Sequence, residues 1–170
     1  MRVVDKHIVD DKGTQSTWET VERTNVSGRG AVIIVALTTD GELIFQKNWR
    51  APLETYIIQF PAGLMDIPGE TDEQTARREL LEETGYMADK LVPVISVPLA
   101  PAVMPTRAMH FFAPDVRYSG EPTGKDEEEI EVIRVQLGKV SDFLLNLPAG
   151  VELDLRVPGI LWVMKEKKLI

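Results

Sequence analysis

The sequence predicts one domain of mixed α+β or α/β-sandwich class, and three observations carry this prediction. A length of 170 residues favours a single domain over two small ones. A hydrophobic fraction of 44% is enough to bury a sizeable core. Expected strands, one clear helix, more strands and more helices follow one another along the chain, an order that differs from strict βαβ repetition.

The first part of the chain reads as strands. Residues 1–30 are polar, with one expected strand at Trp18–Arg23. The run Ala31–Leu37 is continuous and β-branched, which suits a buried strand. Asp40-Gly41 is a strong hairpin signal and predicts a partner strand over Glu42–Trp49. A third strand is expected at Tyr56–Phe60, followed by a loop rich in proline and glycine.

The clearest helix lies between Thr71 and Gly85. Thr71 can be its N-cap, with Gln74 three residues later completing a capping box. Two acidic residues, at 72 and 73, suit the positive end of the helix dipole. Gly85 is placed to end the helix in the left-handed conformation.

The remaining elements are weaker signals. Strands are expected at Leu91–Val97, Arg107–Phe112 and Ile130–Val135. A helix is expected near Val140–Leu145 and another from Pro158 to Lys167.

Composition excludes several classes of protein. The formal net charge is -8, and an acidic surface repels phosphate backbones, so a broad nucleic-acid platform is not expected. The absence of cysteine excludes disulfide frameworks, zinc–thiolate sites and cysteine nucleophiles. Only two histidines are present, too few for a histidine-rich metal site. No apolar run approaches the roughly 20 residues of a membrane-spanning helix, and no export signal opens the chain, so we expect a cytoplasmic protein without a membrane partner.

The predicted helix carries three carboxylates on one face. With Glu79 at zero, Glu82 lies at about −60° and Glu83 at about +40° around the helix axis. Glutamates at these spacings repel one another by a few tenths of a kcal/mol per pair. A hard divalent cation would turn the repulsion into ligation, because Mg²⁺ prefers oxygen ligands and keeps waters for substrate phosphates. A solvated acidic helix face is the alternative for these three residues alone.

The residues around this face resemble the Nudix box. Gly63…Glu70-x7-Arg78-Glu79-Leu80-x-Glu82-Glu83-x-Gly85-Tyr86 is similar to the family pattern G-x5-E-x7-R-E-U-x-E-E-x-G-U at every fixed position from Glu70 onward. One departure is visible, because the loop between Gly63 and Glu70 is one residue longer than the pattern. The resemblance implies a Nudix fold, an α/β/α sandwich with a mixed β-sheet. It implies one Nudix domain over residues 1–170, with the box at 63–86.

Further similarity points to one branch of the family, the ADP-ribose and nucleoside-diphosphate-sugar pyrophosphatases. Gln46–Arg50 and Phe60–Gly63 resemble the Gln-x-Arg and Glu-x-Pro-Ala-Gly stretches of that branch, with Gln59 where a glutamate is common. Pro101 follows the box by 15 positions, as is typical of ADP-ribose hydrolases. Residues 126–132 resemble an acidic loop and strand that supply an extra carboxylate.

The resemblance also assigns roles. Glu79 and Glu83 are expected as primary Mg²⁺ ligands with the carbonyl of Ala62, and Mn²⁺ as a substitute ion. Glu82 is expected to bind a further ion or to help at the reacting water. In the acidic loop, Glu128 and then Asp126 are the candidates for the general base; a mobile solvated loop is the alternative.

Two further residues are candidates for substrate binding on chemical grounds. Arg50 can clamp a phosphate, because guanidinium is planar and bidentate. Trp49 can stack on a base, although an aromatic beside a strand is more often part of the core. Glu70 and Arg78 are expected to be structural, with Arg78 pairing with a glutamate and orienting the site.

The implied reaction is Mg²⁺-dependent hydrolysis of ADP-ribose or another nucleoside diphosphate sugar to a nucleoside monophosphate and a sugar phosphate. One alternative is another nucleotide pyrophosphate, such as a dinucleoside polyphosphate or NADH. Another is a non-catalytic nucleotide-sensing Nudix domain. A third is a plain acidic interaction domain. The resemblance also implies a homodimer built through the N-terminal strand extension, at about residues 1–30.

Overall fold

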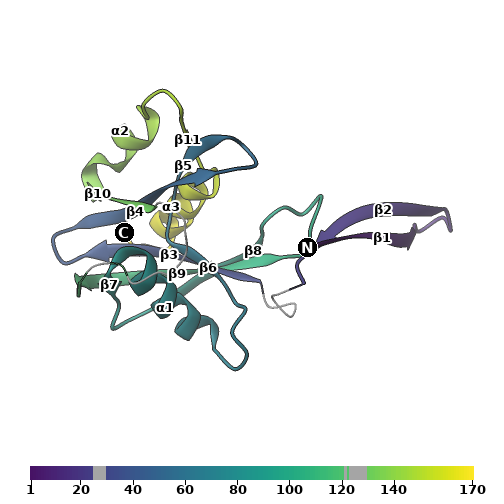
Figure 1. The fold of residues 1–170 in the computed structure, drawn as a ribbon, viewed down its shortest axis with the longest axis horizontal. Helices are drawn as coiled ribbons and strands as arrows, with labels where there is room; N and C mark the ends of the chain where they lie inside the picture. Colours follow the sequence, from purple (N-terminus) through teal and green to yellow (C-terminus); the bar gives the residue numbers. More distant parts are fainter. Residues whose placement is uncertain (25–29, 121, 123–129) are drawn as a thin grey trace.

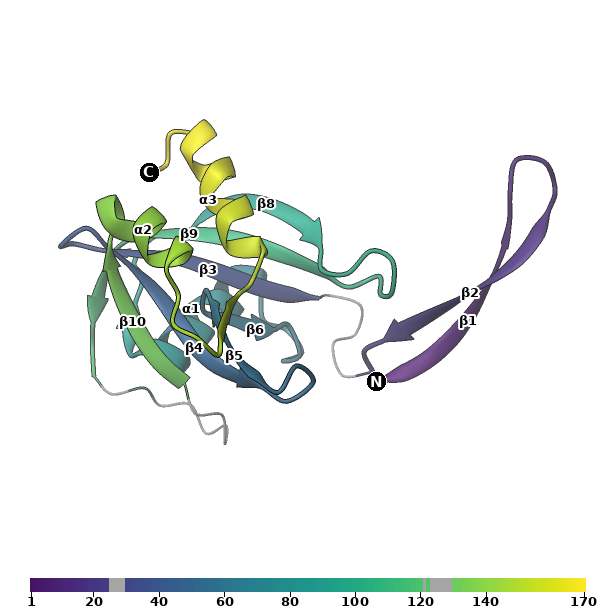
Figure 2. The same ribbon diagram turned by 90° about the horizontal axis from the view of Figure 1, so that it is seen from above.

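A computed structural model of the chain describes residues 1–24, 30–120, 122 and 130–170. The first two strands, β1 (Arg2–Val9) and β2 (Gln15–Glu22), form a separate antiparallel hairpin that projects away from the body (Figures 1 and 2). The sequence indicates only one strand here, because the hairpin is exposed along nearly its whole length and shows no clear alternation of apolar and polar residues.

The described part of the body contains a mixed sheet of nine strands, ordered β11-β5-β4-β3-β9-β7, with β10 paired to β4, β6 to β3 and β8 to β9. Its strands are β3 (Ala31–Thr38), β4 (Glu42–Arg50), β5 (Thr55–Gln59), β6 (Ala62–Leu64), β7 (Tyr86–Met87), β8 (Val92–Pro98), β9 (Arg107–Tyr118), β10 (Ile130–Gln136) and β11 (Val151–Leu153). The pairs β3–β9 and β11–β5 are parallel, whereas the other pairs are antiparallel.

Helices cover both faces of this sheet (Figure 2). They are α1 (Asp72–Thr84), the 3-10 turn η1 (Leu137–Lys139), α2 (Val140–Leu145) and α3 (Arg156–Glu166). Ala76 and Leu80 of α1 pack with Ile34 in one buried cluster. Val140 of α2 and Ile160 of α3 belong to a second cluster on the other face. The predicted α/β/α sandwich with a mixed sheet is therefore confirmed.

Several elements differ from the sequence prediction. Strands β6, β7 and β11 are two or three residues long and were not expected, because such short pieces carry no periodicity and are fixed by their pairing partners. Strand β9 continues to Tyr118 rather than ending at Phe112. Helix α3 begins at Arg156 instead of Pro158, and its proline is tolerated because the first turn needs no amide hydrogen there. Among the described residues, no helix is long and apolar enough to cross a bilayer.

Candidate active site

Helix α1 is fixed at both ends by the residues that the sequence indicates. Thr71 accepts a hydrogen bond from the backbone of Gln74 at 3.2 Å, and the Gln74 side chain accepts one from the Thr71 backbone at 2.8 Å. Gly85 ends the helix with φ of 73°, and its N–H donates to Leu81. The buried side of α1 packs on the sheet, and Glu79 and Glu83 lie on that same side, against β6 and β4, whereas the more exposed Glu82 lies at its edge.

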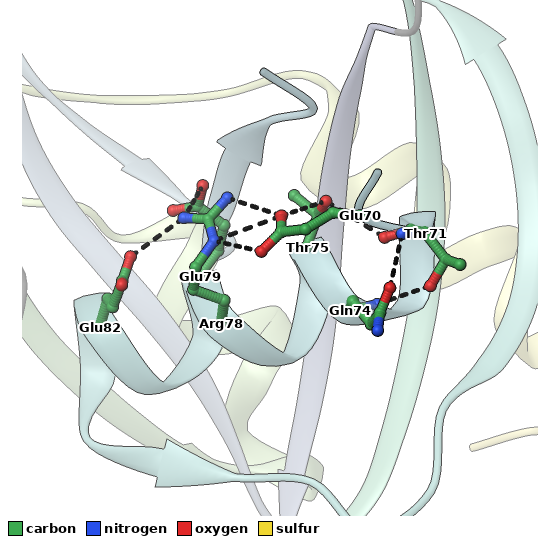
Figure 3. A network of polar contacts seen from close by, with 7 residues as sticks. All are labelled: Glu70, Thr71, Gln74, Thr75, Arg78, Glu79 and Glu82. Atoms are coloured by element: carbon green, nitrogen blue, oxygen red, sulfur yellow. Dashed lines mark hydrogen bonds and ion pairs between the residues drawn. The ribbon is translucent and has the colours of Figure 1, made fainter. Parts of the chain in front are cut away.

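Arg78 is the centre of an ionic network on α1 (Figure 3). Its Nε donates to Glu70 at 3.1 Å, and its Nη1 donates to Glu79 at 2.9 Å and to Glu82 at 3.0 Å. Thr75 holds Glu70 from the other side through a hydroxyl hydrogen bond of 3.0 Å. Burial lowers the pKa of Arg78, but the three carboxylates outweigh it and raise that pKa overall. The expected pairing of Arg78 with a glutamate is confirmed, and it involves three.

Glu79 is held in a confined place beside strand β6. Only 14% of its side chain is exposed. Burial raises the pKa of Glu79, and the charges of Glu82 and Asp66 add to that effect while Arg78 opposes it. A Cβ at position 63 would lie 1.9 Å from the Glu79 carboxyl carbon, so a side chain there would force the Glu79 carboxylate out of its present position.

Glu83 is oriented by two donors from different strands. Gln46 of β4 donates to its Oε2 through Nε2 at 2.8 Å. The backbone N–H of Ala62, at the start of β6, donates to the same oxygen at 3.0 Å. The turn Pro61–Gly63 thus lies directly against the two glutamates predicted as metal ligands.

These glutamates open into a cavity of about 450 Å³. It is lined by Arg23, Ala31, Ile33, Arg50, Gln59, Phe60, Ala62, Gly63, Leu64, Asp66, Glu79, Glu83, Leu99, Asp154, Arg156, Val157 and Ile160. Three arginines and four carboxylates therefore share one cavity. Arg50 donates to the Gln59 side chain at 2.7 Å. The Nε of Arg23 is buried and has no hydrogen-bond partner among the residues that the structure describes.

The structure brings together some of the predicted site residues. Glu79, Glu83, Ala62 and Arg50 all line the cavity. Glu82 instead pairs with Arg78, and 38% of its side chain is exposed.

The predicted stacking residue does not line the cavity, and the candidates for the general base are not described by the structure. Trp49 is half exposed, on the opposite side of β4 from Arg50, and packs edge-on against Tyr56 at 5.1 Å. The candidates Asp126 and Glu128 lie outside the described residues.

Five residues of the site escaped the sequence interpretation as functional groups: Arg23, Gln46, Asp66, Asp154 and Arg156. Arg23 follows the N-terminal hairpin, Asp154 follows β11 and Arg156 begins α3, so no local motif connects them with the box. Asp66 lies within the box loop, and its acidic character was the one signal that could have suggested it.

The two cavity glutamates suit a hard divalent cation that keeps several of its coordinated water molecules. Within residues 1–24, 30–120, 122 and 130–170, no three acidic or histidine side chains are arranged to hold a metal ion by themselves. Mg²⁺ commonly uses one or two carboxylates and completes its octahedron with waters and substrate phosphates. Glu79 and Glu83 both line the cavity and supply two carboxylates, which fits that role.

Comparison with known proteins gives consistent matches. The model of the NUDIX domain family matches residues 28–152. An ADP-ribose pyrophosphatase of Bacillus subtilis is 36% identical over 80% of this chain and 72% of its own length. A methanol dehydrogenase activator of Bacillus methanolicus is 30% identical over 74% of this chain and 68% of its own length. An ADP-ribose pyrophosphatase of Saccharomyces cerevisiae is 33% identical over 89% of this chain and 71% of its own length.

A solved structure agrees with these relatives. The crystal structure of an ADP compounds hydrolase superposes with a TM-score of 0.79 at 27% identity. The match covers 96% of this chain and 84% of the other, so it includes nearly every element described above.

Proposed function

We propose, from the premise that this chain belongs to the NUDIX domain family, that it is a Nudix hydrolase of ADP-ribose or other nucleoside diphosphate sugars. The products are a nucleoside monophosphate and a sugar phosphate. The observation that carries this proposal is the single cavity in which two box glutamates meet three arginines. Relatives named ADP-ribose pyrophosphatase, and a structural neighbour named ADP compounds hydrolase, support the same substrate class.

The arginines suit a substrate with two linked phosphates. Hydrolysis adds water to one phosphorus and breaks its bond to the bridging oxygen, so negative charge grows on the leaving phosphate. Arg50, held by Gln59, and Arg23, with an unused buried Nε, are placed to neutralise that charge. The residues of this cavity therefore bind and orient the diphosphate.

We assign the divalent ion to Glu79 and Glu83, with the Ala62 carbonyl and Glu82 as further ligands, and we propose Mg²⁺ with Mn²⁺ as a substitute. A bound ion supplies Lewis-acid polarisation and a lowered water pKa. The contribution of this chain's own residues is to fix the orientation of the carboxylates through hydrogen bonds. Gln46 and the Ala62 N–H fix Glu83, and Arg78 fixes Glu79 and Glu82.

Other parts of the hypothesis stay predictions. Glu128 or Asp126 as the general base, Trp49 as a stacking platform for the base of the nucleotide, and a homodimer are untested. The same holds for a cytoplasmic location and for the absence of nucleic-acid and membrane partners. The organisation as one Nudix domain over residues 1–170 is also a proposal.

The test measures monophosphate release from ADP-ribose, GDP-mannose and UDP-glucose, with Mg²⁺, with Mn²⁺ and with a chelator. Glu79→Gln and Glu83→Gln are compared with Glu73→Gln, an exposed residue in the first turn of the same helix. We expect metal-dependent turnover that falls at least about 100-fold in the first two variants, because even partners of metal ligands commonly cost 10–100-fold. Glu73→Gln should retain full activity.

Full activity of Glu83→Gln would show the metal assignment to be wrong. Nucleotide binding without turnover of any of the three sugars would instead favour the sensing alternative or a different pyrophosphate. A panel extended to dinucleoside polyphosphates and NADH separates these two outcomes.

A further inference from the structure

A second group of charged residues lines the cavity, and it comes from the C-terminal end of the chain. Strand β11 pairs in parallel with β5, which sets Leu153 beside Ile58. The N–H of Asp154 then donates to the Ile58 carbonyl at 3.0 Å. This pairing places Asp154 and Arg156 next to the end of β5, where Gln59 faces the cavity.

Arg156 is held by one edge of its guanidinium group. Its Nε donates to both oxygens of Asp154, at 2.8 and 2.9 Å, and its Nη2 also donates to Asp154. The backbone N–H of Arg156 donates to the same carboxylate at 2.9 Å. The Nη1 group has no hydrogen-bond partner in the part of the chain that the structure describes. The two-nitrogen end of the guanidinium, the edge that matches a phosphate bidentately, is therefore available to a ligand.

Asp154 is an ionised partner that holds Arg156 in place. Burial opposes ionisation of Asp154, but the hydrogen bonds and charge of Arg156, together with the charge of Arg50, hold its pKa below the usual range. The carboxylate thus stays ionised at neutral pH and keeps its charge-assisted hydrogen bonds to Arg156.

We propose that Arg156 is a substrate-binding residue that forms, with Arg50, a paired clamp on the diphosphate, and that Asp154 is the positioning residue that aims it. This inference rests on the proposed function, because it names which residues hold the diphosphate of that substrate. Asp154 occupies the Nε side of the guanidinium, both residues line the cavity, and a chain segment more than 100 residues from Arg50 in sequence completes the anion site.

The experiment measures equilibrium binding of ADP-ribose and of inorganic pyrophosphate in chelator, where no turnover occurs, and steady-state kinetics with Mg²⁺. Arg156→Gln should weaken both ligands about 10-fold or more, as expected for loss of a charge-assisted bidentate contact. Arg156→Lys should recover only part of the affinity, because an ammonium group cannot bind bidentately. Asp154→Asn should raise KM with little change in kcat, because Arg156 keeps its charge but loses the carboxylate that orients its guanidinium.

Arg117→Gln is the matched control. Arg117 pairs with Asp89 on the surface outside the cavity, and its replacement changes the net charge of the protein equally. Melting temperatures of all variants separate folding from binding. Unchanged affinity for both ligands in folded Arg156→Gln, or an equal loss in Arg117→Gln, would overturn the proposal. If wild-type protein hydrolyses no nucleoside diphosphate sugar, the proposed function fails, whereas pyrophosphate binding still decides for or against the clamp.

Discussion

Gly63 has no side chain, and this makes room for the carboxylate of Glu79. The atoms that a Cβ would meet are the carbon and oxygen of the carboxyl group itself, at 1.9 and 2.1 Å. Real side chains do not tolerate such contacts, so any larger residue must push Glu79 away. The glycine is required here by the close approach of β6 to α1, and it acts directly on a predicted metal ligand.

We predict that Gly63→Ala lowers kcat/KM for ADP-ribose at least about 10-fold, because it displaces a metal ligand. Overpacking of this kind also costs about 1–3 kcal/mol of stability. Activity and denaturant unfolding are measured beside Gly138→Ala, at an exposed glycine with open space around it. Wild-type activity in Gly63→Ala would contradict the crowding argument.

Arg78 changes the interpretation of the three clustered glutamates. Their spacing predicts mutual repulsion that a metal cation relieves. In the structure a guanidinium already bridges Glu79 and Glu82, and Glu83 is held separately by Gln46 and the Ala62 backbone. The protein therefore offsets part of the repulsion on its acidic face with its own donors.

At the scale of elements, helix α1 depends on a cap that is visible in the sequence. Thr71→Ala removes the hydroxyl oxygen that accepts the hydrogen bond of the Gln74 N–H, which is half of the capping box. We expect a loss of about 1 kcal/mol. In a domain of this size that loss lowers Tm by about 2–4 °C. Thermal unfolding is compared with Ser141→Ala, an exposed serine of α2. Equal melting temperatures for the two variants would argue against the cap.

The elements also show how far sequence reasoning reaches. Thr71, Gln74 and Gly85 carry local signals, because the cap and the left-handed end depend on side chains within a few residues. The run at Ala31–Leu37 and the Asp40-Gly41 turn work in the same way. Strands β6 and β11 could not be predicted, since their extended form depends on pairing with β3 and β5.

Dependence on distant parts of the chain also limits how much of the site could be predicted from the sequence. Glu79 and Glu83 could be chosen from one helix, and Arg50 from its chemistry. Arg23, Asp154 and Arg156 reach the cavity only because the sheet brings the two ends of the chain to the box. No spacing in the sequence indicates that these residues lie near the box, so only the three-dimensional structure could identify them.

The packing of α3 on β9 predicts a pH dependence of stability. His110 of β9 is 2% exposed, and its Nδ1 has no hydrogen-bond partner among the described residues. Burial lowers the pKa of His110 from 6.5, and the charge of Arg156 lowers it further, while Asp154 and the Ile95 and Ala108 backbone groups oppose the shift. The folded state thus binds the proton less readily than the unfolded state does. Stability from the neutral form is complete above pH 6.5 and falls as the pH drops toward the lowered pKa.

We therefore expect the free energy of unfolding to decrease from pH 7.5 to 5.5 more in wild type than in His110→Gln. The difference cannot exceed about 1.4 kcal/mol per pH unit, the limit for one titrating group. Denaturant unfolding at several pH values measures it, with His7→Gln in the exposed hairpin as the control. If the free energy of unfolding changed with pH equally in wild type and His110→Gln, protonation of His110 would not be the cause of the pH dependence.

At the scale of the whole molecule, the N-terminal hairpin needs a partner surface. An isolated two-stranded hairpin is at best marginally stable in water. Between this hairpin and the body, the hydrogen bonds among described residues are that of the Trp18 indole to Ala102 at 3.0 Å and that of Val21 to Val103 at 2.8 Å. Val3 and Val9 lie on one face of β1 and are 70% and 65% exposed. The two exposed valines, with Asp5 and His7 between them on the same face of a projecting arm, favour a second copy of the chain as partner (Figure 1).

We predict a dimer at micromolar concentration, with twice the chain mass of 19.0 kDa. Replacing both valines in Val3→Asp/Val9→Asp should convert it to a monomer, because each charge would have to be buried without a partner. Light scattering across a concentration series measures the mass, with Leu145→Asp, at an 83% exposed position in the body, as the control. A wild-type monomer at tens of micromolar would contradict the dimer. A variant that stays dimeric would instead move the interface off this face of the hairpin. Because Arg23 follows the hairpin directly and lines the cavity, we expect the monomeric variant to bind ADP-ribose more weakly as well.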